Sequence, residues 1–82
     1  MKIKIERGLH MTATERKALK FLASVIGSHH SASCRFGRTD YTIYKRGENK
    51  FQFIAQKMET LTIGKLPELT TNFFLVEIKK QE

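Results

Sequence analysis

The chain contains a single segment with helical periodicity, and this limits the folds that it can adopt. Thr12-Ala13-Thr14-Glu15 has the form of a capping box, in which the side chain of each end residue accepts from the backbone N–H of the other. The apolar residues that follow recur at i, i+3, i+4 and i+7 and form one stripe, namely Leu19, Leu22, Ala23 and Ile26. Gly27 is typical of the position just past a helix end. The sequence therefore predicts one helix over residues 13–26, with one apolar face.

The other apolar residues mostly alternate with polar ones, as in strands that bury one face. This pattern predicts strands at 2–6, 41–45, 51–55 and 73–78, with weaker candidates at 34–36 and 61–63. Arg46-Gly47-Glu48-Asn49 would be the turn of a hairpin, and we expect residues 64–71 to form a loop or a single helical turn. Within the hairpin, the core would receive Tyr41, Ile43, Phe51, Phe53 and Ala55, and the opposite face Thr42, Tyr44, Gln52, Ile54 and Gln56.

A helix with one apolar stripe must bury it against another element, and the predicted sheet is the only candidate. The sequence therefore predicts an α+β fold of the order β-α-β-β-β, with one helix packed on one face of a four- or five-stranded, mainly antiparallel sheet. Eighty-two residues are enough for one domain, residues 1–82. The second face of the sheet would have no helix to cover it.

Composition excludes several classes of protein. Cys34 is the only cysteine, so an internal disulfide framework is excluded and a reducing compartment is favoured. The N-terminal residues alternate charge with isoleucine and lack the apolar run of a secretory signal. No stretch has the length and apolarity of a membrane span. We expect a soluble, cytoplasmic protein with no cofactor. His29 and His30 precede Cys34 with a spacing that matches no standard zinc site, so we expect no metal.

Charge is the property that bears most directly on partners. Fifteen Lys and Arg against eight Asp and Glu give a net charge of +7, and the segment from Arg16 to Arg38 contains no acid. Such a surface favours phosphate-backbone binding. The first functional prediction is a non-catalytic module that binds nucleic acid, DNA or RNA, mainly through the backbone. The residues expected to bind are Arg16, Lys17, Lys20, Arg35 and Arg38 as a continuous patch, with Lys45, Arg46 and Lys50 at the hairpin tip.

The open face of the sheet supports a second hypothesis. Tyr44, Ile54, Phe73 and Leu75 would lie there, and a contiguous exposed apolar patch marks a partner site. The alternative function is therefore binding to another protein with an anionic surface, as a modulator or inhibitor such as a phage- or plasmid-borne regulator or counter-defence protein. A homodimer through this face is one way to cover it. A lid formed by residues 61–70 is the other.

Gly27-Ser28-His29-His30 resembles the glycine-serine-histidine element of the HicA-type toxins, small basic ribonucleases in which a histidine acts in catalysis. The resemblance covers four residues. In that family the element follows a strand and the domain ends with a helix, whereas here it follows the predicted helix and the chain ends with a predicted strand. Acid–base cleavage would also need a partner beside the histidine, for which Asp40 is the nearest candidate. A small ribonuclease toxin is the third alternative, and we expect no enzymatic activity.

Overall fold

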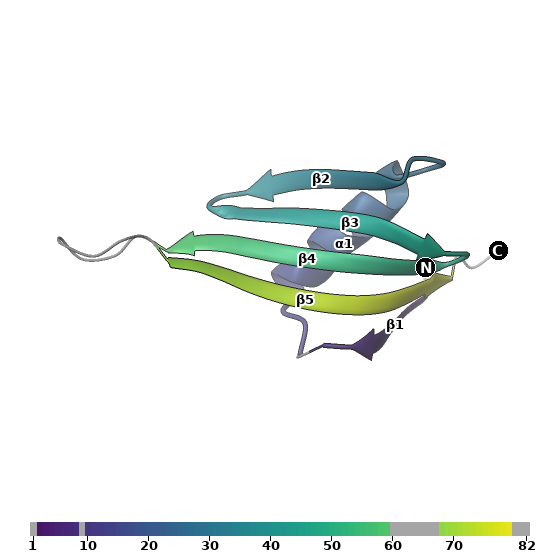
Figure 1. Ribbon diagram of the computed structural model, residues 1–82, viewed down its shortest axis with the longest axis horizontal. Coiled ribbons are helices and arrows are strands. Elements are labelled where there is room, and N and C mark those ends of the chain that lie inside the picture. The colour runs from purple at the N-terminus through teal and green to yellow at the C-terminus, as the bar shows by residue number, and fades with distance from the viewer. Residues whose placement is uncertain (1, 9, 60–67, 80–82) are drawn as a thin grey trace, which may run out of the picture.

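The fold is one helix packed on one face of a five-stranded antiparallel sheet (Figure 1). The structure is a computed structural model and describes residues 2–8, 10–59 and 68–79. The elements are β1 (Lys2–Arg7), α1 (Ala13–Val25), β2 (Ser31–Phe36), β3 (Thr39–Gly47), β4 (Lys50–Glu59) and β5 (Glu68–Lys79). Their order in the sheet is β1-β5-β4-β3-β2. The predicted α+β fold with a single helix is therefore confirmed. No helix among the described segments is long and apolar enough to cross a membrane.

The helix begins with the predicted capping box. The backbone N–H of Thr12 donates to Glu15 Oε1 at 2.9 Å, and that of Glu15 donates to Thr12 Oγ1 at 3.1 Å. Glu15 is only 5% exposed, and Asn72 Nδ2 on β5 donates to its other carboxylate oxygen at 3.4 Å. One buried carboxylate therefore accepts a backbone hydrogen bond at the start of the helix and also links the helix to the sheet. The helix ends at Val25, and Gly27 follows with a φ of +52°.

The core lies between the apolar stripe of α1 and the inner face of the sheet. Leu19 and Leu22 are fully buried, as are Phe53 and Phe74 beneath them. A row of rings crosses four neighbouring strands on this face, with the centroids of successive rings 5.9 Å apart: Phe36, Tyr41, Phe53 and Phe74. The inward and outward sets predicted for the hairpin are confirmed, because the core residues are buried and their neighbours in sequence are not.

Every strand extends beyond its predicted bounds, and the main differences lie in β2, in the hairpin and at the start of β5. β2 occupies all of residues 31–36, and the hairpin turns tightly at Glu48–Asn49, with Asn49 at a φ of +60° and a bulge between Lys45 and Gly47. Residues 68–71, predicted as a loop, belong to β5. Their backbone pairs with the end of β4, so pairing continues beyond the helix, where the side chains of Thr70 and Thr71 are exposed. The candidate strand at 61–63 and the predicted loop residues 64–67 lie outside the described residues.

Gly8, which follows β1, provides a test of the packing between β1 and β5. Its φ is +132°, and a Cβ there would lie 2.7 Å from Phe74 Cδ1 and 2.8 Å from the carbonyl oxygen of Phe73. We expect Gly8→Ala to lower the free energy of unfolding by about 2–3 kcal/mol in urea denaturation. Gly37 is a control with a φ of +60° and open space around it. Gly37→Ala should cost about 1 kcal/mol. Equal losses in the two variants would contradict this account.

Candidate nucleic-acid interface

The outer face of α1 carries the first group of predicted basic residues. Arg16, Lys17 and Lys20 are exposed and lie within one turn of each other, since residues three and four apart are neighbours on a helix. Glu15 is the only acid in the helix, and its carboxylate points inward to the capping box and Asn72. Among the described residues, none forms a salt bridge with these three side chains. The helix therefore presents an uncompensated basic surface, which we call the helix patch.

Arg35 does not extend the helix patch. Cys34 pairs with the buried Tyr41 and faces the helix, so Arg35 points to the opposite face of the sheet. There its Nε lies 2.8 Å from Asp40 Oδ1. Arg38 lies in the turn between β2 and β3, where it lines a shallow depression with Arg35 and Met58. The expected continuous patch from Arg16 to Arg38 is thus divided by the sheet, because alternation along β2 sends its charged residue away from α1.

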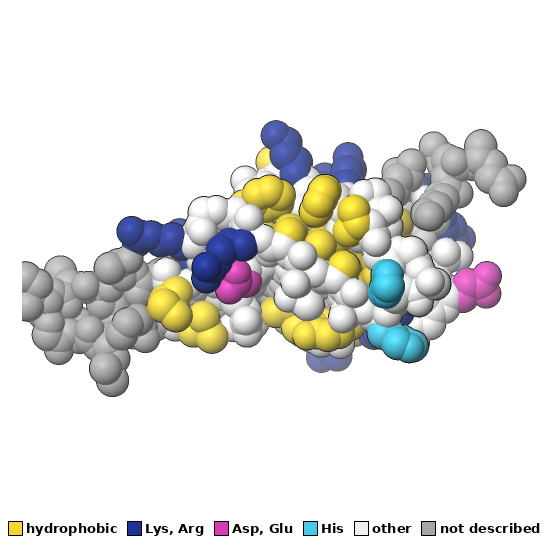
Figure 2. Space-filling model, turned by 90° about the horizontal axis from the view of Figure 1, so that it is seen from above, with side chains coloured by type: hydrophobic (Ala, Val, Ile, Leu, Met, Phe, Trp, Pro, Cys, Tyr) yellow, Lys and Arg dark blue, Asp and Glu magenta, His cyan; other side chains and the backbone are white. Residues whose placement is uncertain are grey.

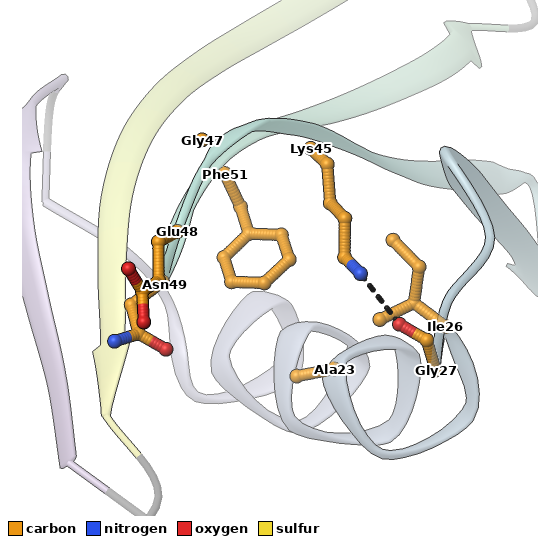
Figure 3. A pocket seen from close by; sticks show the side chains of 8 residues that line it. All are labelled: Ala23, Ile26, Gly27, Lys45, Gly47, Glu48, Asn49 and Phe51. Carbon is orange, nitrogen blue, oxygen red and sulfur yellow. Dashed lines mark hydrogen bonds between the residues drawn. The ribbon is translucent and has the colours of Figure 1, made fainter.

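The predicted cluster at the hairpin tip also separates. Lys45 points towards the helix and its Nζ donates to the carbonyl oxygen of Gly27 at 2.6 Å, in a cleft between the end of α1 and the β3–β4 turn (Figure 3). Arg46 Nη2 lies 3.3 Å from Glu6 Oε2, although β5 and β4 separate their strands in the sheet. Lys50 is opposite Glu77 on β5. The three side chains therefore have different surroundings, and that of Lys45 forms a hydrogen bond at the end of the helix.

The contact made by Lys45 predicts a structural role. A cation near the last carbonyl groups of a helix interacts favourably with the helix dipole. We expect Lys45→Met, which keeps the aliphatic stem, to lower the free energy of unfolding by about 0.5–1 kcal/mol. Lys50→Met on the same hairpin is the matched control and should change stability by less than about 0.5 kcal/mol. Thermal or chemical denaturation measures both, and a Lys45→Met protein as stable as the control would contradict the assignment.

The four residues predicted for a protein interface lie together on the open face. Phe73 is directly opposite Ile54, and Gln52 has Leu75 on one side and Tyr44 on the other. Tyr44 is 43% and Phe73 44% exposed, whereas Ile54 and Leu75 are half-buried. The lid considered for this face would be formed mainly by residues outside the described ranges. The open face is thus an apolar patch with two exposed rings.

The histidines and the cysteine do not form a reactive centre with Asp40. His29 and His30 are exposed in the loop after α1, near the start of β2, whereas Asp40 pairs with Arg35 near the end of β2. Burial raises the pKa of the Cys34 thiol, which disfavours the nucleophilic thiolate. Within residues 2–8, 10–59 and 68–79, no group of three or more His, Cys, Asp or Glu side chains is placed to hold a metal ion.

The sequence analysis did not identify two features of the surface. The first is Lys57, which lines a groove with Thr12 and Glu15 at the start of the helix. The alternation of Phe51, Phe53 and Ala55 places the next residue but one, Lys57, on the same helix-side face of the strand. The second feature is a set of exposed apolar residues at the β2 edge: Phe21, Val25 and Phe36. Phe21 and Val25 are four residues apart on α1 but outside the main stripe, and this spacing was the available signal.

Comparison of the chain with family models, curated proteins and solved structures finds no match in any of the three. The functional argument therefore rests on the residues of the chain itself.

Proposed function

We propose that this protein is a non-catalytic domain that binds nucleic acid through the phosphate backbone, with the helix patch as the contact surface. The observation that supports this is the position of Glu15. The only acid of the helix is turned inward and buried, so the charges of Arg16, Lys17 and Lys20 face solvent without a local counter-charge. Backbone binding depends on such charges, because each phosphate that they neutralise releases condensed counterions.

Three basic residues outside the helix differ from the helix patch because each has an acidic partner. Arg35 pairs with Asp40, Arg46 with Glu6 and Lys79 with Glu77. These three basic residues, all on strands, are therefore partly neutralised within the protein, whereas the helix patch is not. The capping box also fixes the start of α1. The three cations are consequently carried by a rigid element, and Lys57 lies beside the same end of the helix.

A contact of this kind gives affinity without sequence readout. Three cations on one helix can neutralise about three phosphates, which corresponds to a slope of about −2.7 in log K against log salt for duplex DNA. Contacts to phosphates position a protein but carry no base information. We therefore expect binding that tolerates changes in sequence and weakens steeply with salt.

The test compares two variants of equal charge. Arg16→Gln/Lys17→Gln/Lys20→Gln removes the helix patch, and Arg46→Gln/Lys50→Gln/Lys79→Gln removes the same charge from the strands. We expect the helix variant to bind a DNA duplex of arbitrary sequence at least roughly tenfold more weakly than the wild type. The slope of log K against log salt should be near zero. The strand variant should keep most of the affinity and slope. Fluorescence anisotropy over a salt series measures both, and circular dichroism checks folding.

Two results would overturn the proposal. Equal losses in the two variants would mean that net charge, not the helix patch, governs binding. No binding by the wild type at about 50 mM salt would remove nucleic acid as the ligand. The second result would favour the other function, protein binding through the open face, for which the exposed rings of Tyr44 and Phe73 are the specific observation.

A further inference from the structure

β2 is an edge strand whose outer backbone groups follow a defined pattern. The backbone N–H of Lys45 donates to the carbonyl oxygen of His30 at 3.0 Å, so His30 and Lys45 form a hydrogen-bonded pair across β2 and β3. Such pairs alternate along an antiparallel ladder. The N–H and C=O groups of Ser31, Ser33 and Arg35 therefore point away from β3. Among the described residues, no strand pairs with this outer edge.

The two edges of the sheet differ in how they are protected. β1, the other edge, carries Lys2 and Lys4 and is interrupted by a bulge between Ile5 and Arg7. Lysine and bulges are the usual devices that prevent an edge from recruiting another strand. β2 consists of Ser31-Ala32-Ser33-Cys34-Arg35-Phe36 and pairs with β3 without a bulge. Its one charge, on Arg35, is compensated by Asp40. β2 is thus open to a further strand.

Apolar side chains flank the β2 edge on the helix side. Phe21 is 49%, Val25 50% and Phe36 47% exposed, and the rings of Phe21 and Phe36 meet edge to face at 6.5 Å. Viewed from this edge, hydrophobic side chains gather along the molecule (Figure 2). A strand added beside β2 would have its helix-side residues next to this group. The edge therefore offers both backbone hydrogen bonds and apolar surface.

We propose that a second copy of this chain occupies the edge, with β2 of each copy paired antiparallel about Ser33. In this register Ser33 is opposite Ser33 of the second copy, and Ser31 is opposite Arg35. The outward groups of Ser31, Ser33 and Arg35 are then all hydrogen-bonded. On the helix side, Ala32 and Cys34 face each other between the copies.

The charges and shape of β2 select a second copy as the occupant. No like charges are opposed, because each Arg35 faces a serine. The small side chains of Ala32 and Cys34 leave room for the apolar residues from both helices. The two-fold axis is perpendicular to the sheet, so both α1 helices lie on the same side of a sheet that is twice as wide. The dimer therefore presents two helix patches on one surface. The use of that surface for binding rests on the proposed function.

Ser33 allows a direct test, since it is the one residue that faces itself. Ser33→Lys and Ser33→Glu each place like charges on two directly opposed residues whose Cα atoms are about 5.5 Å apart, and we expect each to raise the dimer dissociation constant by roughly fivefold or more. An equimolar mixture opposes Lys with Glu and should restore association. Ser33→Pro removes only an outward N–H, so the monomer should fold and remain monomeric at about 50 µM. Sedimentation velocity measures all of these, with circular dichroism as the check on folding.

Residues on the open face provide the controls. Thr71 is exposed on β5 and shares the open face with Ser33, so Thr71→Lys and Thr71→Glu carry the same charges away from the β2 edge. These variants and Leu75→Lys should dimerise as the wild type does. A wild type that is monomeric at about 50 µM would overturn the proposal. So would a dimer that Leu75→Lys disrupts and Ser33→Pro does not, which would place the interface on the open face.

Nucleic-acid binding separates this proposal from the function on which it partly rests. Ser33→Pro retains the helix patch, so it should still bind duplex DNA with a slope of about −2.7, whereas the wild-type dimer should approach about −5. A dimer that binds no nucleic acid would leave the β2 interface intact and remove the proposed function. Identical slopes of log K against log salt for a dimeric wild type and a monomeric variant would contradict only the claim that the two helices of the dimer bind nucleic acid together.

Discussion

One helix must cover the sheet, and most features of the structure follow from that constraint. α1 buries Leu19 and Leu22 against Phe53 and Phe74 near the middle of the sheet. A single helix can cover only one face, so the other face remains open with Tyr44, Ile54, Phe73 and Leu75 on it. Burial at the centre is the main stabilising term for such a small domain, because little other apolar area is removed from water. The surfaces available for binding are those that the helix leaves exposed.

The distribution of charge follows from the same arrangement. Three acidic side chains on the strands, those of Glu6, Asp40 and Glu77, each form a salt bridge with a basic residue. Glu15 is used to begin the helix and to contact Asn72. These four acids are thus engaged in local contacts, and none of them neutralises the basic residues on the outer side of α1. This is a physical reason for placing a contact with an anionic partner on the helix.

The sequence was sufficient to predict features that depend on local patterns. The capping box, the stripe of α1 and the alternation within β3 and β4 each involve neighbouring residues, and all three are confirmed. The direction of Arg35 was not predicted because it depends on the register of β2 against Tyr41, which local alternation near Cys34 did not fix. The contact of Lys45 with Gly27 likewise requires the helix end and the hairpin to meet in space. Site residues that depend on such meetings cannot be inferred from spacing alone.

The exposed apolar side chains at the β2 edge, like the core, result from the path of α1 across the sheet. The start of α1 is held near β5 by the contact of Glu15 with Asn72, and the helix crosses the sheet diagonally towards β2 (Figure 1). Its later turns therefore lie near the edge strand β2, where Phe21 contacts Phe36. Apolar side chains on that side of α1 extend past the sheet, because no sixth strand lies beneath them in the described part of the chain. A partner strand at this edge would continue the core that the helix has already begun to form there.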